Sequence, residues 1–167
     1  MLLHDLADRL NTVADQLPLP DQIRPDPALS EILDDEVRHL ARLLGYLAGE
    51  SALRHRAAAR YPAQDTATQR RITFALARAA EPTGAALAAL GSAIHVIGVI
   101  ANLTHQGPGQ ARDRAAAHQH LADRLDESRT HLARAAKGLR KAADTRTAPI
   151  PAAPAPSPPA AITSRTR

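Results

Sequence analysis

No charged residue occurs between Glu81 and Arg112, and this run constrains the fold more than any other feature of the chain. A helix of about twenty apolar residues is long enough to cross a bilayer. In a helical bundle, a helix that is apolar on every side is instead the central member, covered by its neighbours. Residues 83–104 are the most apolar part of the run, but His95 and Asn102 within it disfavour insertion. We therefore expect residues 83–104 to be a buried bundle helix, with a membrane-inserted helix as the alternative.

The apolar residues are mostly aliphatic, because the chain has one Phe, two Tyr and no Trp among its 167 residues. Alanine has the highest intrinsic helix propensity, whereas strands are enriched in β-branched and aromatic residues. A chain of this length has the usual size of one domain. The composition thus predicts an all-α single domain with an aliphatic core.

Apolar residues recur at intervals of three and four in four segments, which is the spacing of one helix face. Prolines and glycines separate these segments, and Pro82 interrupts one of them, either as a kink or as the start of a new helix. We predict an antiparallel bundle of three long helices with a short amphipathic N-terminal helix packed alongside. The expected bounds are residues 2–17 for the short helix, 18–27 for a proline-rich connector, and 28–60, 66–104 and 111–143 for the long helices.

Local signals mark the expected helix ends. Asp26 offers a side-chain acceptor immediately before Pro27, which suits the first position of a helix. Thr66 and Gln69 are three residues apart, the spacing of a capping box that satisfies two backbone donors. The Gly-Pro-Gly loop at residues 107–109 separates the last two helices.

The C-terminal residues 145–167 contain six prolines and no sustained apolar repeat. Such a segment cannot bury enough apolar surface to offset the entropy lost on ordering. We expect residues 1–144 to form the bundle and residues 145–167 to be a disordered Pro/Ala-rich tail that acts as a linker.

Charge is distributed unevenly along the chain. The overall net charge is +4, and residues 145–167 account for +3 of it, so the expected bundle is nearly neutral. Residues 1–36 carry a net charge of −7, whereas residues 37–80 carry +6. Because these charges are complementary, we expect the N-terminal helix to dock on the basic middle region.

Five arginines flank the turn at Tyr61 and Pro62, where two helix ends are expected to meet. Cations near a helix C-terminus complement the helix dipole, which explains part of this cluster. The remainder makes a candidate binding surface for an anion or a nucleic acid. The candidate residues are Arg54, Arg56, Arg60, Arg70 and Arg71.

Convergent reactive groups are not predicted anywhere in the chain. The absence of cysteine excludes disulfides, thiolate metal sites and cysteine nucleophiles. Glu36 and His39 form one half of the Glu-x-x-His pattern of di-iron bundles, but no second half exists, and we interpret them as part of a solvated face. We interpret His95 as a core histidine with a hydrogen-bond partner. A further polar stripe on the last helix is interpreted as a salt-bridged surface rather than a metal site, and it contains His120, Arg124, Glu127 and His131.

These features predict a non-catalytic helical interaction or scaffolding protein that acts by self-association or by binding a partner helix. No cofactor and no metal are expected, and the partner is another protein or a second copy of the chain. Two alternatives stay open: a membrane-associated protein that inserts residues 83–104, and a nucleic-acid or anion binder that uses the Arg54–Arg71 cluster. The N-terminus lacks the pattern of a signal peptide, so we expect a cytoplasmic location.

Overall fold

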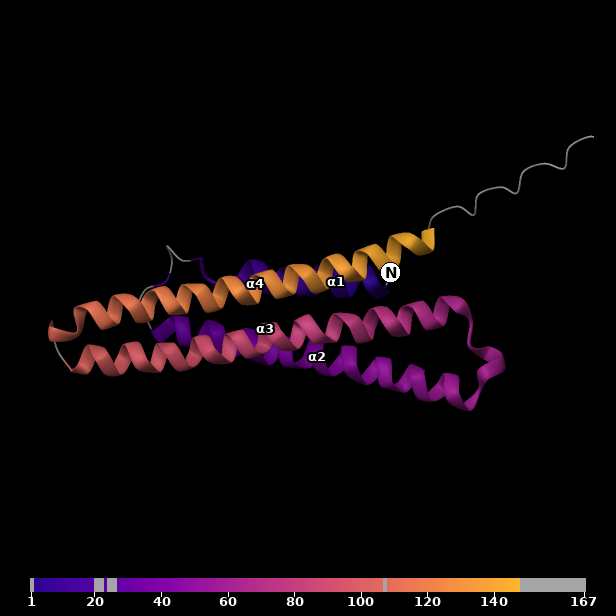
Figure 1. The fold of residues 1–167 in the computed structure, drawn as a ribbon, viewed down its shortest axis with the longest axis horizontal. Coiled ribbons are helices and arrows are strands. Elements are labelled where there is room, and N and C mark those ends of the chain that lie inside the picture. Colours follow the sequence, from indigo (N-terminus) through magenta and orange to yellow (C-terminus); the bar gives the residue numbers. More distant parts are fainter. Residues whose placement is uncertain (1, 20–22, 24–26, 107, 148–167) are drawn as a thin grey trace, which may run out of the picture.

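The computed structural model describes residues 2–19, 23, 27–106 and 108–147, and within them it contains helices and no strand. The predicted antiparallel helical bundle is confirmed for these residues (Figure 1). The expected tail from residue 148 onward lies outside the described residues, and the last helix continues beyond the expected boundary at residue 144. The elements are α1 (Leu2–Gln16), α2 (Pro27–Arg60), the 3-10 turn η2 (Pro62–Gln64), α3 (Ala67–His105), the 3-10 turn η3 (Pro108–Gln110) and α4 (Ala111–Thr147).

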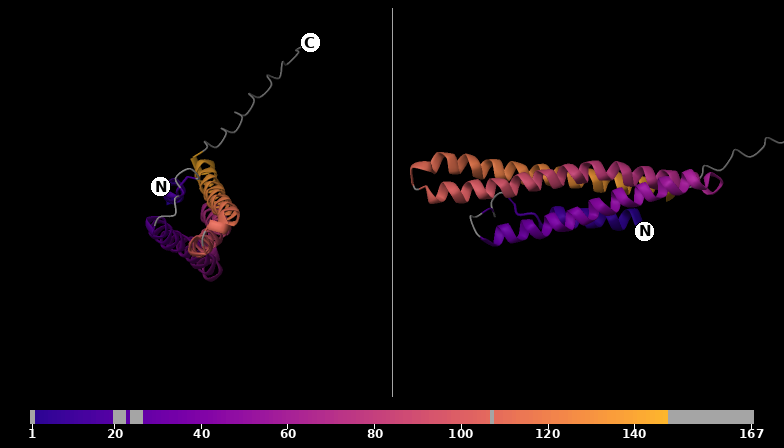
Figure 2. Two further views of the ribbon diagram at one scale, coloured as in Figure 1. Left: turned by 90° about the vertical axis from the view of Figure 1, so that its left-hand side faces the viewer. Right: turned by 90° about the horizontal axis from the view of Figure 1, so that it is seen from below.

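The helical hairpin of α3 and α4 is the centre of the bundle, and these two helices share the most extensive contact. Helix α2 lies along α3 and α1 lies along α4, whereas α1 and α2 touch each other little. The views in Figures 1 and 2 show an elongated molecule in which the short α1 covers only part of the length of the other helices. One long face of the α3–α4 hairpin therefore has none of the described helices packed over it.

The core is aliphatic, as the composition predicts. Leucines spaced at helical intervals line the inner face of each helix, because positions three, four or seven apart return to the same side. Alanines between them allow the helix backbones to approach closely. The largest fully buried side chains include Leu10 in α1, Leu33, Leu40 and Leu47 in α2, Leu76 and Leu90 in α3, and Leu121, Leu125, Leu132 and Leu139 in α4.

Helix α3 runs without interruption through Pro82, so the sequence alternative of a helix break at this position is wrong. A proline inside a helix removes the backbone donor for the carbonyl four residues earlier. The next residue, Thr83, is buried and its hydroxyl donates to the carbonyl oxygen of Ala79 at 2.8 Å. Pro82 and Thr83 are both buried in the core of the bundle, and α3 continues as one helix on either side of them.

The expectation that residues 83–104 are buried on every side is wrong. Their inner face is covered, but Ser92, His95 and Val99 on the outer side are exposed. Among the described helices, α2 and α4 are the ones that pack along α3, and two neighbours cannot enclose a whole helix. His95 is consequently a surface residue and not the core histidine expected from the sequence.

Helix α1 does not dock mainly on the basic middle region, which corrects the expectation from block charges. It packs on α4, where Asp8 forms an ion pair with Arg140 at 2.8 Å. The Arg129 guanidinium donates to the carbonyl oxygens of Leu17, at 2.7 Å, and Pro18, just after the end of α1. The apolar stripe of α1 and individual polar partners thus decide where it docks. The net charge of a long segment does not specify which of its side chains lie next to another helix.

We predict that Leu90→Ala lowers the free energy of unfolding by about 2–5 kcal/mol, because it leaves a cavity among fully buried side chains. Leu53→Ala removes the same atoms from a side chain that is 56% exposed, and we expect a change within about 0.5 kcal/mol. Urea unfolding followed by circular dichroism measures both. Equal losses for the two variants would contradict the observed packing.

We also predict that Arg129→Ala destabilises the protein by about 1–3 kcal/mol, since carbonyl oxygens at the end of α1 lose a charged donor. Arg112→Ala is the matched control, because Arg112 is exposed and has no ion pair among the described residues. The measurement is the chemical unfolding midpoint of each variant. If the two substitutions have the same effect, the guanidinium of Arg129 does not hold α1 in place.

Candidate functional site

The end of α2, the turn η2 and the start of α3 form an arm, residues 48–74, in which no residue is buried. From position 48 to position 74 every residue is exposed or half-buried, whereas Leu47 and Ala75 on either side are buried. Leu53 and Tyr61 within the arm are 56% and 54% exposed. Helices in proteins are stabilised mostly by packing of an apolar face. The arm therefore depends on its caps and polar contacts.

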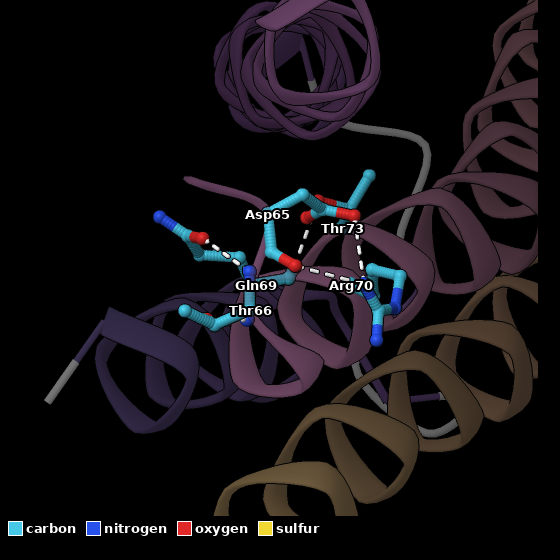
Figure 3. A network of polar contacts seen from close by, with 5 residues as sticks. All are labelled: Asp65, Thr66, Gln69, Arg70 and Thr73. Atoms are coloured by element: carbon cyan, nitrogen blue, oxygen red, sulfur yellow. Dashed lines mark hydrogen bonds and ion pairs between the residues drawn. The ribbon is translucent and has the colours of Figure 1, made fainter. Parts of the chain in front are cut away.

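The start of α3 carries the capping box expected from the sequence (Figure 3). The Gln69 backbone N–H donates to Thr66 Oγ1 at 3.2 Å, and the Thr66 backbone N–H donates to Gln69 Oε1 at 2.8 Å. Arg70 reaches back across the turn, where it donates to the carbonyl oxygen of Asp65 at 2.8 Å and pairs with its carboxylate at 3.1 Å. These contacts fix the direction in which α3 leaves the turn.

The five arginines predicted as an anion site do not form one surface of free cations. Arg54 pairs with Glu50 at 2.8 Å, and the carboxylate of Asp65 neutralises Arg70. Arg56, Arg60 and Arg71 are exposed and have no ion pair among the described residues. Arg71 faces a different hollow from the one that Arg54 lines. The turn is thus less available to an anion than its composition indicates.

A groove of about 580 Å³ lies between α3 and α4, and we call it the α3–α4 groove. It is lined from position 71 to position 85 of α3 and from 131 to 145 of α4. Its floor consists mainly of small residues, including Ala75, Ala79 and Ala135, which are buried. Phe74 on its edge is 67% exposed, the largest exposed fraction among the large apolar side chains of the described residues.

The edges of the α3–α4 groove are strongly basic. Five exposed cations and one carboxylate, Glu81, line it, which gives a net charge of +4 with His131 neutral. None of the five cations has an ion-pair partner among the described residues, whereas Arg129 and Arg140, elsewhere on α4, are both paired with aspartates. The five are Arg71, Arg78, Arg134, Lys137 and Lys141.

Of the residues that line this groove, Arg71 and His131 were considered as site residues from the sequence, and the other four cations were not. The cations of α4 recur at intervals of three and four, so their shared helix face could have been read from the chain. Their position opposite Arg71 and Arg78 could not be predicted from the sequence, because it depends on how α3 and α4 are aligned. The buried Ser128 fixes part of that alignment, since its hydroxyl donates to the carbonyl oxygen of Ala86 at 3.2 Å.

The polar residues considered as metal ligands on α4 form ion pairs along the helix. Arg124 pairs with Glu127 at 2.7 Å, and His131 lies 3.8 Å from the same carboxylate. Among the described residues, no three His, Cys, Asp or Glu side chains are close enough to hold a metal ion.

Glu36 is not part of a solvated face, contrary to the sequence interpretation, because it is only 8% exposed. Burial raises the pKa of its carboxyl group above the ordinary value of 4.5, and the charge of Asp35 adds to this. His39, whose Nδ1 lies 4.0 Å from the carboxylate, acts in the opposite direction. Glu36 lies between the buried Leu33 and Leu40 on one face of α2, which explains its burial.

Comparison with protein-family models, with curated proteins and with solved structures gives no match to this chain.

Glu36 provides a pH-dependent prediction. Because its pKa is raised in the folded state, the folded protein binds this proton more tightly, and stability falls as pH rises above about 4.5 through the folded pKa. Glu36→Gln removes the ionisation, so the variant should be more stable than the wild type at pH 7 and lose this advantage near pH 4. Glu31→Gln, which alters an exposed carboxylate on the same helix, is the control. Unfolding midpoints across this pH range test the sign, and a stabilisation by Glu36→Gln that is confined to acidic pH would contradict it.

Proposed function

We propose that this protein is a non-catalytic helical interaction protein that binds a partner helix in the α3–α4 groove. The observation that supports this most directly is the groove itself, an apolar floor between two helices with cations on both edges that are unpaired among the described residues. Apolar floors with charged edges are the usual form of helix-binding grooves, in which the floor contributes affinity and the edges select the partner.

The dimensions of the α3–α4 groove suit a helix. Fifteen residues of helix extend about 22 Å, and the groove is lined along that length of both α3 and α4. Small floor residues such as Ala79 and Ala135 leave room for the larger side chains of a third helix, which can pack between the ridges of the first two. Phe74 would cover one flank of such a helix.

A nucleic-acid partner is less well supported. Nucleic-acid surfaces combine cations with aromatic or polar groups that contact bases. Phe74 is the only Phe, Tyr or Trp among the described residues that line the α3–α4 groove, and the floor of alanines would have to face phosphates and sugars. Two of the five arginines predicted near the turn already have carboxylate partners.

The membrane alternative has one observation in its favour. Helix α3 is the one described helix that is long and apolar enough to cross a bilayer, and 33% of its most apolar window is buried. However, Ser128 of α4 contacts Ala86 of α3, so the charged residues Asp126 and Arg129 lie at the same level of the hairpin as the apolar segment. Insertion of residues 83–104 would either draw these charges into lipid or separate α3 from α4.

We predict that a photoreactive aromatic residue at the groove captures the partner. With p-benzoylphenylalanine in place of Phe74, irradiation of cells that naturally make this protein should give a cross-linked product of defined mass. The same replacement at Tyr61, an aromatic residue of similar exposure at the turn, should not. The mass of the product distinguishes a second copy of this chain from another protein. Equal yields from the two positions would contradict the proposal.

A further inference from the structure

We infer that the partner of the α3–α4 groove is an acidic amphipathic helix of about four turns, with large aliphatic residues on its inner face. This inference rests on the proposed function and specifies the chemistry of the partner. Two observations support it: the charge of the groove and the packing of the protein's own helix α1 on α4.

The charge of the groove selects an acidic partner. Arg71 and Arg78 on one edge face the cations of α4 on the other, and Glu81 is the single carboxylate among the described residues that line the groove. These cations have no ion pair among the described residues, and the like charges on the two edges repel one another. A helix with carboxylates along both flanks would replace this repulsion with attraction on both edges at once.

Helix α1 provides an internal example of the same chemistry. It is an acidic amphipathic helix of 15 residues, with three aspartates and one arginine, and it packs on another face of α4. Its Leu6 and Leu10 are buried, and its Asp8 pairs with Arg140 of α4 at 2.8 Å. The α3–α4 groove is lined along the same number of residues as α1 contains. Helix α4 thus holds one acidic amphipathic helix by an apolar contact and an arginine–aspartate pair, and its groove presents unpaired cations to a second.

The size of the floor residues specifies the partner further. Alanines at positions 75, 79 and 135 and the glycine at 138 place the floor close to the helix backbones. A helix with only small residues would leave this space unfilled, whereas leucines at intervals of three and four would occupy it. The C-terminal residues 145–167 are not a suitable occupant, because they carry three arginines and no acid.

A fluorescent peptide with the sequence of residues 2–17 is the probe, titrated with the full-length protein and followed by anisotropy. We expect saturable binding that weakens as salt is added, accompanied by a gain of helical circular dichroism from the peptide. The double variant Arg78→Glu/Lys137→Glu should bind at least tenfold more weakly. The control Arg56→Glu/Arg60→Glu reverses two exposed arginines outside the groove, which are also unpaired among the described residues, and should bind within about twofold of the wild type.

A third variant, Arg140→Glu, distinguishes peptide binding in the groove from peptide binding at the site that α1 itself occupies. Binding that survives Arg140→Glu and is lost in the groove double variant supports the inference. Loss with Arg140→Glu alone means that the peptide replaces α1, which overturns it. Absence of binding, groove-dependent binding of duplex DNA or of phosphatidylglycerol vesicles in its place, or groove-dependent dimerisation of the protein alone also overturns it.

Failure of this inference is distinguishable from failure of the proposed function. If the Phe74 cross-link captures a protein while the acidic peptide does not bind, the groove binds a helix of different chemistry. If the Phe74 position captures nothing, the proposed function fails whatever the peptide does.

Discussion

The close packing of α3 against α4 is the contact on which the rest of the structure depends. Small residues on the inner face of α3, such as Ala86 and Ala93, bring the two backbones together, and leucines such as Leu90 and Leu125 fill the space between them. The buried hydroxyl of Ser128 bonded to the Ala86 carbonyl contributes to their alignment. Helix α2 packs on α3 and helix α1 packs on α4, and α1 and α2 contact each other little.

An incompletely covered hairpin has direct consequences for the surface. Each added helix covers one flank, so the outer face of α3 and the α3–α4 groove remain open, and the arm between positions 48 and 74 extends past the buried core. The protein distributes its charges accordingly. Arg140 at the α1–α4 contact is paired with Asp8, whereas the five cations that line the groove have no ion pair among the described residues.

The sequence by itself determined much about this protein. Helix type, number and approximate bounds follow from apolar spacing, from prolines confined largely to connectors, and from the cap at Thr66 and Gln69, all of which act over one or two turns. The aliphatic core followed from composition. Such features are local, because helix hydrogen bonds and caps join residues a few positions apart.

Only the tertiary structure decided what lies next to what. The exposure of His95, the burial of Glu36 and the docking of α1 on α4 each differ from the sequence interpretation, since burial depends on which neighbours cover a given side of a helix. The groove brings Arg71 and Arg78 beside cations more than fifty positions away. No local pattern encodes this alignment, because it arises from the interlocking of side chains across the whole length of two antiparallel helices.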